Sequence, residues 1–159
     1  MTLSLPRGAA LLAGAGSLGL LLGAFGFQYI GAIPPCPMCL WQRWPHALAA
    51  ILGVAAATTG RVRLCALAGA AAMTVSTGLG IFHSGVERHW WDGPSTCTSS
   101  AQQGLEGSAL FDQIMNAPLV RCDEIAWDLA GLSMPNFNAI FSLLLLALWI
   151  ATFAAAWRR

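Results

Sequence analysis

Residues 137–156 read FNAIFSLLLLALWIATFAAA, twenty consecutive residues without one charged side chain. The hydrocarbon core of a bilayer is about 30 Å thick, and about 20 helical residues cross it. Within lipid, every backbone N–H and C=O group has to be paired inside the segment, which a helix achieves. This stretch therefore predicts a membrane-spanning helix.

Three further apolar runs precede it, so that the predicted spans cover residues 9–28, 41–58, 64–82 and 137–156. The second run is the least apolar, because Arg43 and Pro45 lie at its start. We expect residues 1–159 to form a single integral membrane domain. Its predicted fold class is an all-α membrane protein, a four-transmembrane-helix bundle with one long extracytoplasmic loop.

The composition of the chain agrees with a membrane protein. Hydrophobic residues make up 57% and charged residues only 9%, whereas a soluble domain carries about 25% charged residues. All basic residues are arginines, and the net charge is +1. No basic patch interleaved with aromatic residues occurs, so we expect the partners to include the lipid bilayer and no nucleic acid.

The arginines orient the predicted spans. Five of the eight lie at the two termini or in the turn between the second and third spans: Arg7, Arg61, Arg63, Arg158 and Arg159. The positive-inside rule places these segments and both termini in the cytoplasm. The loops 29–40 and 83–136 then lie on the outer side.

Within the long outer loop, apolar residues recur at helical spacing over Leu105–Asn116. This pattern predicts a short amphipathic helix, which lies on the membrane–water boundary or packs on the bundle itself. Four tryptophans are typical of aromatic belts at the membrane interfaces: Trp90, Trp91, Trp127 and Trp149.

Small residues on the first span predict either close helix packing or mere filling of lipid-facing positions. The spacing Gly19-x-x-x-Gly23 is the pattern in question. Such spacing lets two helix backbones approach each other within a membrane. Both interpretations remain open at this point.

The chemistry-bearing motif is Cys36-Pro37-Met38-Cys39, at the start of the second span. Proline is favoured at the first position of a helix, which makes Cys36 the N-cap and puts Cys39 at the third helical position. The positive end of the helix dipole stabilises a thiolate there. The motif therefore predicts a redox-active pair rather than a staple, because a disulfide that closes so short a loop contributes little stability.

Arg43 follows Cys39 by four residues, one helical turn deeper on the same face. An arginine at this depth either stabilises the Cys39 thiolate or an anionic ligand, or extends to the lipid headgroups. Beside a C-x-x-C pair we favour the functional role.

A second pair, Cys97 and Cys122, lies in the outer loop, so both pairs face the compartment in which disulfides persist. Zinc binding by the four cysteines is disfavoured, because the second pair lacks the short spacing of zinc ligands. The alternative of two purely structural disulfides would account for Cys97 and Cys122. It would not account for the short spacing of Cys36 and Cys39. The fifth cysteine, Cys65, lies far from the others in this topology and is expected to be an inert apolar residue.

Four spans, Cys36-x-x-Cys39-x-x-x-Arg43, a histidine near the outer end of the third span (His83) and a late second pair form a recognisable set. The stretch from Cys122 to Pro135 also reads C-x-x-x-x-W-x-x-x-G-x-x-M-P. Over nearly its whole length the chain resembles the DsbB family of membrane thiol:quinone oxidoreductases.

The resemblance implies an enzyme of the bacterial inner membrane that reoxidises a periplasmic DsbA-like thiol oxidase and passes the electrons to a membrane quinone, ubiquinone or menaquinone. It implies that Cys97 forms the mixed disulfide with the partner and that Cys122 is its mate. Cys36 and Cys39 then pass the electrons on, with Cys39 beside the quinone. Arg43 and His83 line the quinone site, and no metal is expected.

Two other readings remain. A vitamin K epoxide reductase-like quinone and thiol oxidoreductase shares four spans and a C-x-x-C motif, but carries that motif near the end of its bundle. A membrane scaffold with structural disulfides is the alternative that is not an enzyme.

Overall fold

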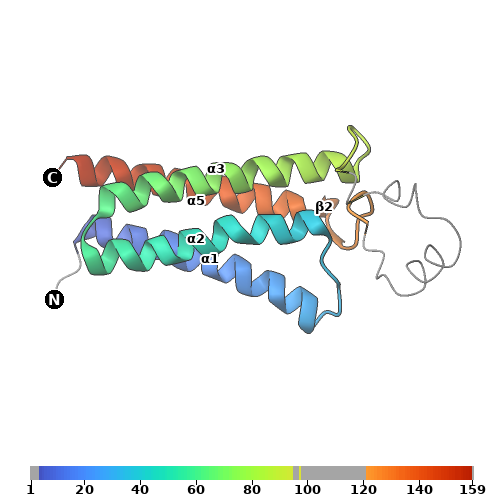
Figure 1. Ribbon diagram of the computed structural model, residues 1–159, viewed down its shortest axis with the longest axis horizontal. Helices are drawn as coiled ribbons and strands as arrows, with labels where there is room; N and C mark the ends of the chain where they lie inside the picture. Colours follow the sequence, from blue (N-terminus) through green and yellow to red (C-terminus); the bar gives the residue numbers. More distant parts are fainter. Residues whose placement is uncertain (1–3, 95–96, 98–120, 159) are drawn as a thin grey trace, which may run out of the picture.

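The computed structural model describes residues 4–94, 97 and 121–158. Four long helices form a bundle within these residues (Figure 1). Their bounds are Leu5–Tyr29 (α1), Pro37–Thr59 (α2), Val62–Glu87 (α3) and Met134–Trp157 (α5). Each helix contains its predicted span and extends beyond it. The predicted amphipathic helix over Leu105–Asn116 lies outside the described residues.

Three of these helices, α1, α3 and α5, are long and apolar enough to cross a membrane. The second helix is not among them, although its 23 residues are a sufficient length. Polar side chains near its start, including Gln42, Arg43 and His46, lower its hydropathy. That α2 is a fourth span remains a prediction.

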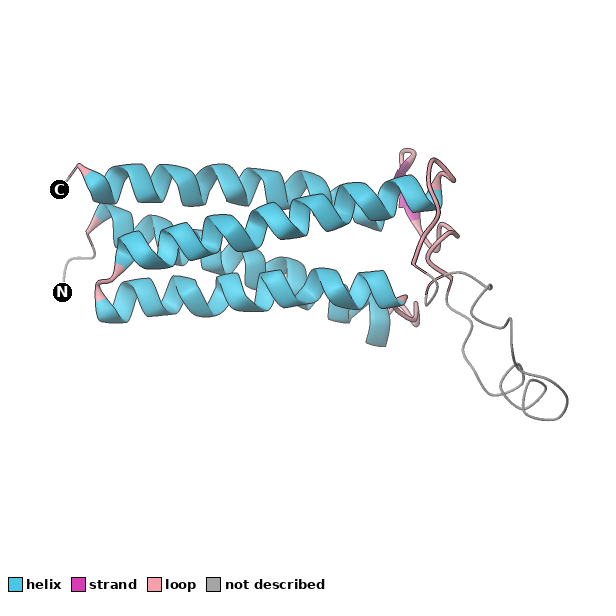
Figure 2. Ribbon diagram, turned by 45° about the horizontal axis from the view of Figure 1, so that its top comes forward, coloured by secondary structure: helices cyan, strands magenta, loops and turns pink. Residues whose placement is uncertain are grey.

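The helices run antiparallel to their neighbours in the chain, so the bundle has two chemically different ends (Figures 1 and 2). We call the end that holds both termini and the turn around Gly60 the arginine end. Arg63 Nε donates a hydrogen bond to the Ala156 carbonyl there, at 2.9 Å. The opposite end, where α2 begins and α3 stops, is the cysteine end.

Small residues set the helix packing near the arginine end. A Cβ atom added to Gly14 of α1 would lie 2.9 Å from the Cα of Gly53 of α2, so the two backbones are in contact. A Cβ atom on Gly69 of α3 would lie 2.5 Å from the ring of Trp149 of α5. Trp149 is fully buried in this contact. The expectation that it belongs to an interfacial belt is therefore wrong, because Gly69 leaves room for its ring inside the bundle.

Gly19 and Gly23 of α1 do not make the close helix–helix contact that their spacing could predict. No protein atom lies within 4 Å of a Cβ atom added to Gly19 or Gly23, and both residues are exposed. The helix–helix contact is made by Gly14 instead, because α1 diverges from α2 toward the cysteine end (Figure 1).

A short hairpin, which the sequence analysis did not predict, closes the cysteine end. Strand β1 (Asp128–Leu129) pairs antiparallel with β2 (Leu132–Ser133) through a two-residue turn. Ala130 and Gly131 both have positive φ, as a tight primed turn requires. The hairpin leads directly into α5, whose second residue is Pro135.

Candidate functional site

The site begins at the first turn of α2, which forms as predicted. Cys36 is the N-cap, and its sulfur accepts a hydrogen bond from the backbone N–H of Cys39 at 3.2 Å. The Cys36 thiol donates to the sulfur of Cys39, with the two Sγ atoms 3.0 Å apart. Both sulfurs therefore lie at the positive end of the helix dipole.

The two thiols differ in how they hold a proton. The hydrogen bond to Cys39 and burial together raise the pKa of the Cys36 thiol. Cys36 thus remains protonated, and Cys39 is the sulfur on which a negative charge is stabilised by the helix and by the Cys36 proton. Cys36 is almost completely buried, whereas Cys39 is only partly so.

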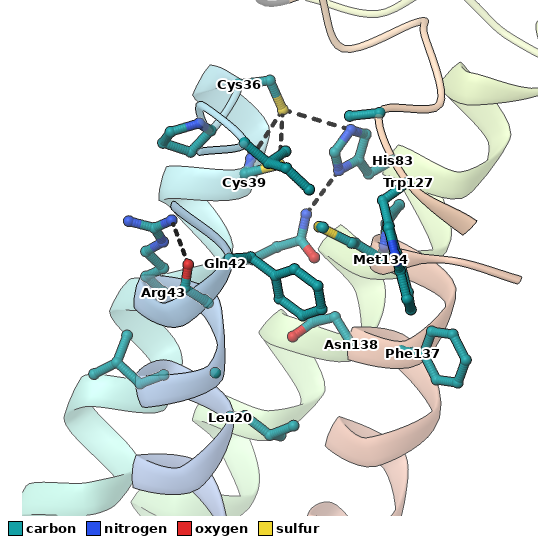
Figure 3. Close-up of a pocket in the computed structure, with 18 of the residues that line it drawn as sticks. Leu20, Cys36, Cys39, Gln42, Arg43, His83, Trp127, Met134, Phe137 and Asn138 are labelled. Atoms are coloured by element: carbon teal, nitrogen blue, oxygen red, sulfur yellow. Dashed lines mark hydrogen bonds between the residues drawn. The ribbon is translucent and has the colours of Figure 1, made fainter. Parts of the chain in front are cut away.

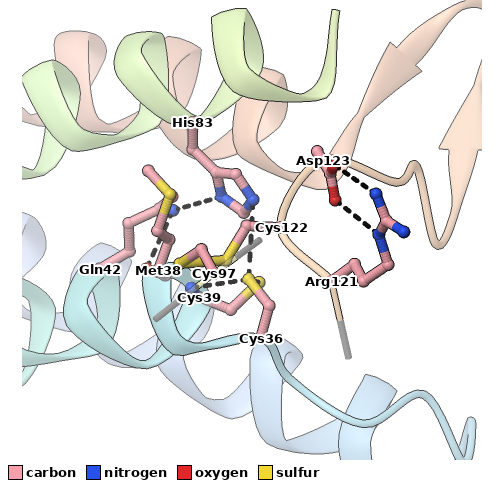
Figure 4. Close-up of a disulfide and its surroundings, with 9 residues drawn as sticks. All are labelled: Cys36, Met38, Cys39, Gln42, His83, Cys97, Arg121, Cys122 and Asp123. Atoms are coloured by element: carbon pink, nitrogen blue, oxygen red, sulfur yellow. Dashed lines mark hydrogen bonds and ion pairs between the residues drawn. A yellow bond between two sulfur atoms is a disulfide. The ribbon is translucent and has the colours of Figure 1, made fainter. Parts of the chain in front are cut away.

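The second pair is placed directly against the first. Cys97 and Cys122 form a disulfide, which packs with Cys36 and Met38 of α2 and Val86 of α3 (Figure 4). The Cys122 N–H donates to the Cys97 carbonyl at 3.0 Å. The structure thus brings together all four predicted cysteines, although they come from three separate parts of the chain.

An ion pair lies next to the disulfide (Figure 4). Arg121 donates to both carboxylate oxygens of Asp123, at 2.9 and 2.6 Å. The hydrogen bond from Arg121 lowers the pKa of the Asp123 carboxyl. Because these residues flank Cys122 in sequence, their ion pair restricts the backbone on both sides of that cysteine.

His83 lies beside the thiols and, like them, lines the cavity described below. Its Nε2 atom is 3.6 Å from the Cys36 sulfur, and its Nδ1 atom is 2.9 Å from Nε2 of Gln42. The Gln42 amide nitrogen also donates to the Met38 carbonyl, at 3.2 Å, which fixes it as the donor toward His83. In a neutral His83 the proton is therefore on Nε2, where it points to Cys36.

Gln42 is a site residue that the sequence analysis missed. Its position three residues after Cys39, on the same helix face, is the only sequence signal for it. Its role is to orient His83, because its amide nitrogen is itself held by the Met38 carbonyl.

A cavity of about 360 Å³ opens next to Cys39, between the four helices and the hairpin (Figure 3). Apolar and aromatic side chains form most of its wall, and the rings of Phe27, Trp127 and Phe137 follow one another at centroid distances of 5.1 and 6.0 Å. The exposed Gly19 and Gly23 line its α1 side. An apolar cavity with a few polar groups is typical of a site for a small organic ligand.

Arg43 lines this cavity on the side of α1 (Figure 3). Its Nη1 atom donates to the Gln28 side chain at 2.6 Å, and its guanidinium lies 4.8 Å from the ring centroid of Phe25. The Nε atom is buried and has no hydrogen-bond partner among the described residues. Arg43 is therefore held by α1 rather than extended to headgroups, with one donor still to be satisfied.

Glu87 is a second site residue that the sequence analysis missed. It lies one turn after His83, is buried and lines the cavity. Its carboxylate accepts a hydrogen bond from Ser133, which in turn accepts one from Asn136 at 2.6 Å. The only sequence signal for Glu87 was its i,i+4 spacing from His83, which places both residues on the same helix face.

Three ligand-type atoms, from Cys36, Cys39 and His83, lie within 4.8 Å of one another and are close enough to hold a metal. Structural zinc sites have four protein ligands, and Cys97 and Cys122 are bonded to each other. The absence of a metal stays a prediction. Cys65, the remaining cysteine, is buried in the apolar core near the arginine end, away from the site.

Comparison with known proteins identifies the family of the chain. The sequence profile of the family described as Disulfide bond formation protein DsbB matches residues 6–152. No solved structure matches the chain.

Individual relatives are moderately similar. The Disulfide bond formation protein B of Albidiferax ferrireducens is 30% identical, over 90% of this chain and 83% of the relative. Proteins of the same name from Marinobacter nauticus and Hahella chejuensis are 28% and 29% identical, and cover 82% and 89% of this chain. The matches extend over 81% and 87% of those relatives. The chain therefore belongs to the DsbB family of disulfide bond formation proteins.

Proposed function

We propose that the protein reoxidises a DsbA-like periplasmic thiol oxidase and passes the electrons to a membrane quinone, thereby supporting disulfide formation in exported proteins. One observation carries the proposal. Both cysteine pairs lie in one packed cluster, and the Cys36–Cys39 pair borders an apolar cavity. A disulfide, a dithiol and a ligand site are thus arranged in series.

The first exchange takes place at the Cys97–Cys122 disulfide. A thiolate of the reduced partner attacks the sulfur of Cys97, and Cys122 leaves as a thiolate. The second partner thiolate then attacks the mixed disulfide, which releases the oxidised partner and leaves Cys97 and Cys122 as a dithiol. Two electrons and two protons have moved from the partner to this chain.

The second exchange restores that disulfide. Cys97 and Cys122 pass two electrons to a Cys36–Cys39 disulfide and bond to each other again, which leaves the Cys36–Cys39 dithiol. The proximity of the two pairs suits this step, because thiol–disulfide exchange requires direct contact between sulfurs. The state described by the structure, with a Cys97–Cys122 disulfide and free Cys36 and Cys39, is the product of this exchange.

The cavity fits a quinone. Its aromatic walls suit a flat ring. Arg43 Nε is a buried donor without a partner among the described residues, so a carbonyl oxygen of the ring can accept a hydrogen bond from it. Arg43, His83 and the aromatic residues would hold the ring next to Cys39. When bound, a quinone supplies an acceptor for two electrons and two protons.

The residues around the thiols prepare Cys39 for this step. The hydrogen bond from Cys36 and the start of α2 stabilise negative charge on Cys39. His83, oriented by Gln42, holds a proton at Nε2 beside Cys36. Closing the Cys36–Cys39 disulfide releases two protons, and Glu87 is a titratable group on the cavity wall, close enough to act on Cys39, that can receive one of them.

We place the cysteine end on the periplasmic side of the bacterial inner membrane and both termini in the cytoplasm, with all four helices crossing. The distribution of arginines supports this orientation, since Arg7, Arg61 and Arg63 gather at the opposite end. Single cysteines introduced as Thr59→Cys and Asp92→Cys test it in intact spheroplasts with an impermeant label. We expect labelling at position 92 alone, and labelling at position 59 alone would reverse the orientation.

The reaction is tested directly by mixing the purified protein with a reduced DsbA-like oxidase and a soluble quinone. We expect quinone reduction, followed optically, to require the partner and all four cysteines. A scaffold with structural disulfides would reduce no quinone. A vitamin K epoxide reductase-like activity would instead reduce the epoxide of a naphthoquinone when supplied with a dithiol.

A further inference from the structure

A second polar cluster lies deeper in the bundle, at the inner end of the cavity. It comprises His46 of α2, Ser76 of α3, and Asn138 and Ser142 of α5. His46, Ser76 and Ser142 are almost completely buried, and His46 and Asn138 line the cavity. His46 follows Cys39 by seven residues, two turns or about 10 Å along the helix. The cluster is thus separate from the thiols but shares their cavity.

The hydrogen bonds determine which nitrogen of His46 carries the proton. Asn138 Nδ2 lies 3.3 Å from the backbone carbonyl of Ser76, which can only accept, so this atom is the amide nitrogen. The amide oxygen of Asn138 then faces His46 Nε2 at 2.9 Å. Because that oxygen cannot donate, His46 Nε2 is the donor. In the neutral ring, Nδ1 is therefore a bare acceptor.

This acceptor is unsatisfied. His46 Nδ1 is buried and has no hydrogen-bond partner among the described residues. A buried polar atom without a partner is costly, and more so within a bilayer, where water does not compensate. Since the ring of His46 borders the cavity, the missing donor can come from an occupant of the cavity.

We infer that His46 accepts a hydrogen bond at Nδ1 from a ligand hydroxyl, so that the cavity holds a hydroquinone more tightly than the corresponding quinone. The inference rests on the proposed function. A quinone oxygen can only accept hydrogen bonds, so its lone pair would face the lone pair of Nδ1. A hydroquinone hydroxyl, in contrast, can donate a hydrogen bond to Nδ1. Arg43 also lines the cavity, and its Nε atom, which has no partner within the part of the chain that the structure describes, is a donor and suits an oxygen in either state. His46 is therefore the residue that distinguishes the two ligand states.

The test measures binding rather than turnover. The full chain carrying Cys39→Ser, which prevents redox exchange with the ligand, is placed in nanodiscs. Calorimetry then gives the Kd for a short-chain benzoquinone and, without oxygen, for its hydroquinone. His46→Gln is added to this parent, because the glutamine amide nitrogen can replace Nε2 as the donor to Asn138, while the amide oxygen does not occupy the position of Nδ1.

We expect His46→Gln to raise the Kd of the hydroquinone about five- to tenfold, as for the loss of one buried hydrogen bond, and to change the Kd of the quinone less than twofold. Ser17→Ala is the matched control. Ser17 is also buried and hydrogen-bonded, to the sulfur of Met73, but does not line the cavity. Both Kd values should stay unchanged in this control.

Equal changes in the two Kd values, or none, would overturn the role of His46. If the Cys39→Ser parent itself binds neither ligand, the proposed quinone site is wrong. This outcome is seen without the His46 variant, so it is distinct from a failure of the inference about His46. Should His46→Gln fail to fold, the dimethyl ether of the hydroquinone provides a test without it. We expect the parent to bind the ether at least fivefold more weakly than the hydroquinone, and equal binding would contradict the inference.

Discussion

The two halves of helix α1 carry the same kind of residue for opposite purposes. Gly14, toward the arginine end, lies against the backbone of α2, where even a Cβ atom would be too close. Gly19 and Gly23, toward the cysteine end, face open space and line the cavity. In one half of the helix, glycine thus allows close packing against α2. In the other half, glycine leaves space for the cavity.

The difference shows how a small bundle holds its shape around a cavity. In lipid, helices associate through close packing of small residues rather than through the hydrophobic effect. The contacts of Gly14 with Gly53 and of Gly69 with Trp149 join the helices in pairs at one end. Because these contacts fix the helices, α1 can diverge from α2 at the other end (Figure 1), where the cavity lies.

The largest effects are expected at the cysteine end. We expect Cys39→Ser to abolish quinone reduction and Cys97→Ser to abolish reaction with the partner oxidase, because each removes an obligatory sulfur. Cys122→Ser should accumulate a mixed disulfide through Cys97, since its resolving thiol is missing. Gel analysis under non-reducing conditions measures this, and a complex trapped through Cys36 instead would show that the order of transfer is wrong.

Arg43→Ala should weaken quinone use by roughly 5- to 150-fold, the effect of losing a charged hydrogen-bond donor worth about 1–3 kcal/mol. Steady-state kinetics separate a raised KM, expected if Arg43 holds the quinone, from a lowered kcat, expected if it acts on Cys39. Arg43→Lys should restore activity only in part. Gln28→Ala removes one of the α1 partners of Arg43 but keeps the charge, so its effect should be smaller. Wild-type kinetics for Arg43→Ala would remove this residue from the site.

Filling the open half of α1 should block the ligand without disturbing the fold. We expect Gly23→Leu to raise the KM for quinone about tenfold or more. The leucine side chain enters the cavity and takes up space of the ligand, which then buries less apolar surface against the protein. Gly78→Leu is the control, as Gly78 also has no atom within 4 Å of an added Cβ but does not line the cavity. Equal kinetics for the two variants would mean that the ligand does not lie beside α1.

The smallest expected effect compares two alanine substitutions on the same helix. Gly14→Ala should lower the free energy of unfolding by about 1–3 kcal/mol, because the added methyl group forces the backbones of α1 and α2 apart. Gly19→Ala meets no neighbour and should be neutral or stabilising by up to about 1 kcal/mol. Unfolding in detergent measures both. Similar values for the two would remove the distinction between the halves of α1.

Much of this molecule can be predicted from the sequence, because its signals are local. Long apolar runs predict the helices, and the prolines at positions 37 and 135 mark helix starts. The N-cap role of Cys36 follows from Pro37 alone. Spacing within a helix likewise predicted that Arg43 lies one turn beyond Cys39 on the same face, and both residues line the cavity.

The rest depends on contacts between helices, which local patterns do not contain. Whether Gly14 or Gly19 packs against α2 depends on the angle between the helices. The burial of Trp149 depends on Gly69, 80 residues earlier in the chain. Gln42, His46 and Glu87 are single polar residues whose partners come from other elements, so spacing within their own helix is not enough to identify them as members of the site.

All four cysteines and the cavity lie at one end of the bundle, which has an energetic consequence for the proposed reaction. Moving one charge across the whole membrane against 100 mV costs about 2.3 kcal/mol. Electrons that enter at Cys97 and leave beside Cys39 stay at the same side of the bilayer, so the membrane voltage neither opposes nor drives their transfer. The protein would therefore continue to oxidise its partner in vesicles whose membrane potential has been collapsed, as long as oxidised quinone is supplied.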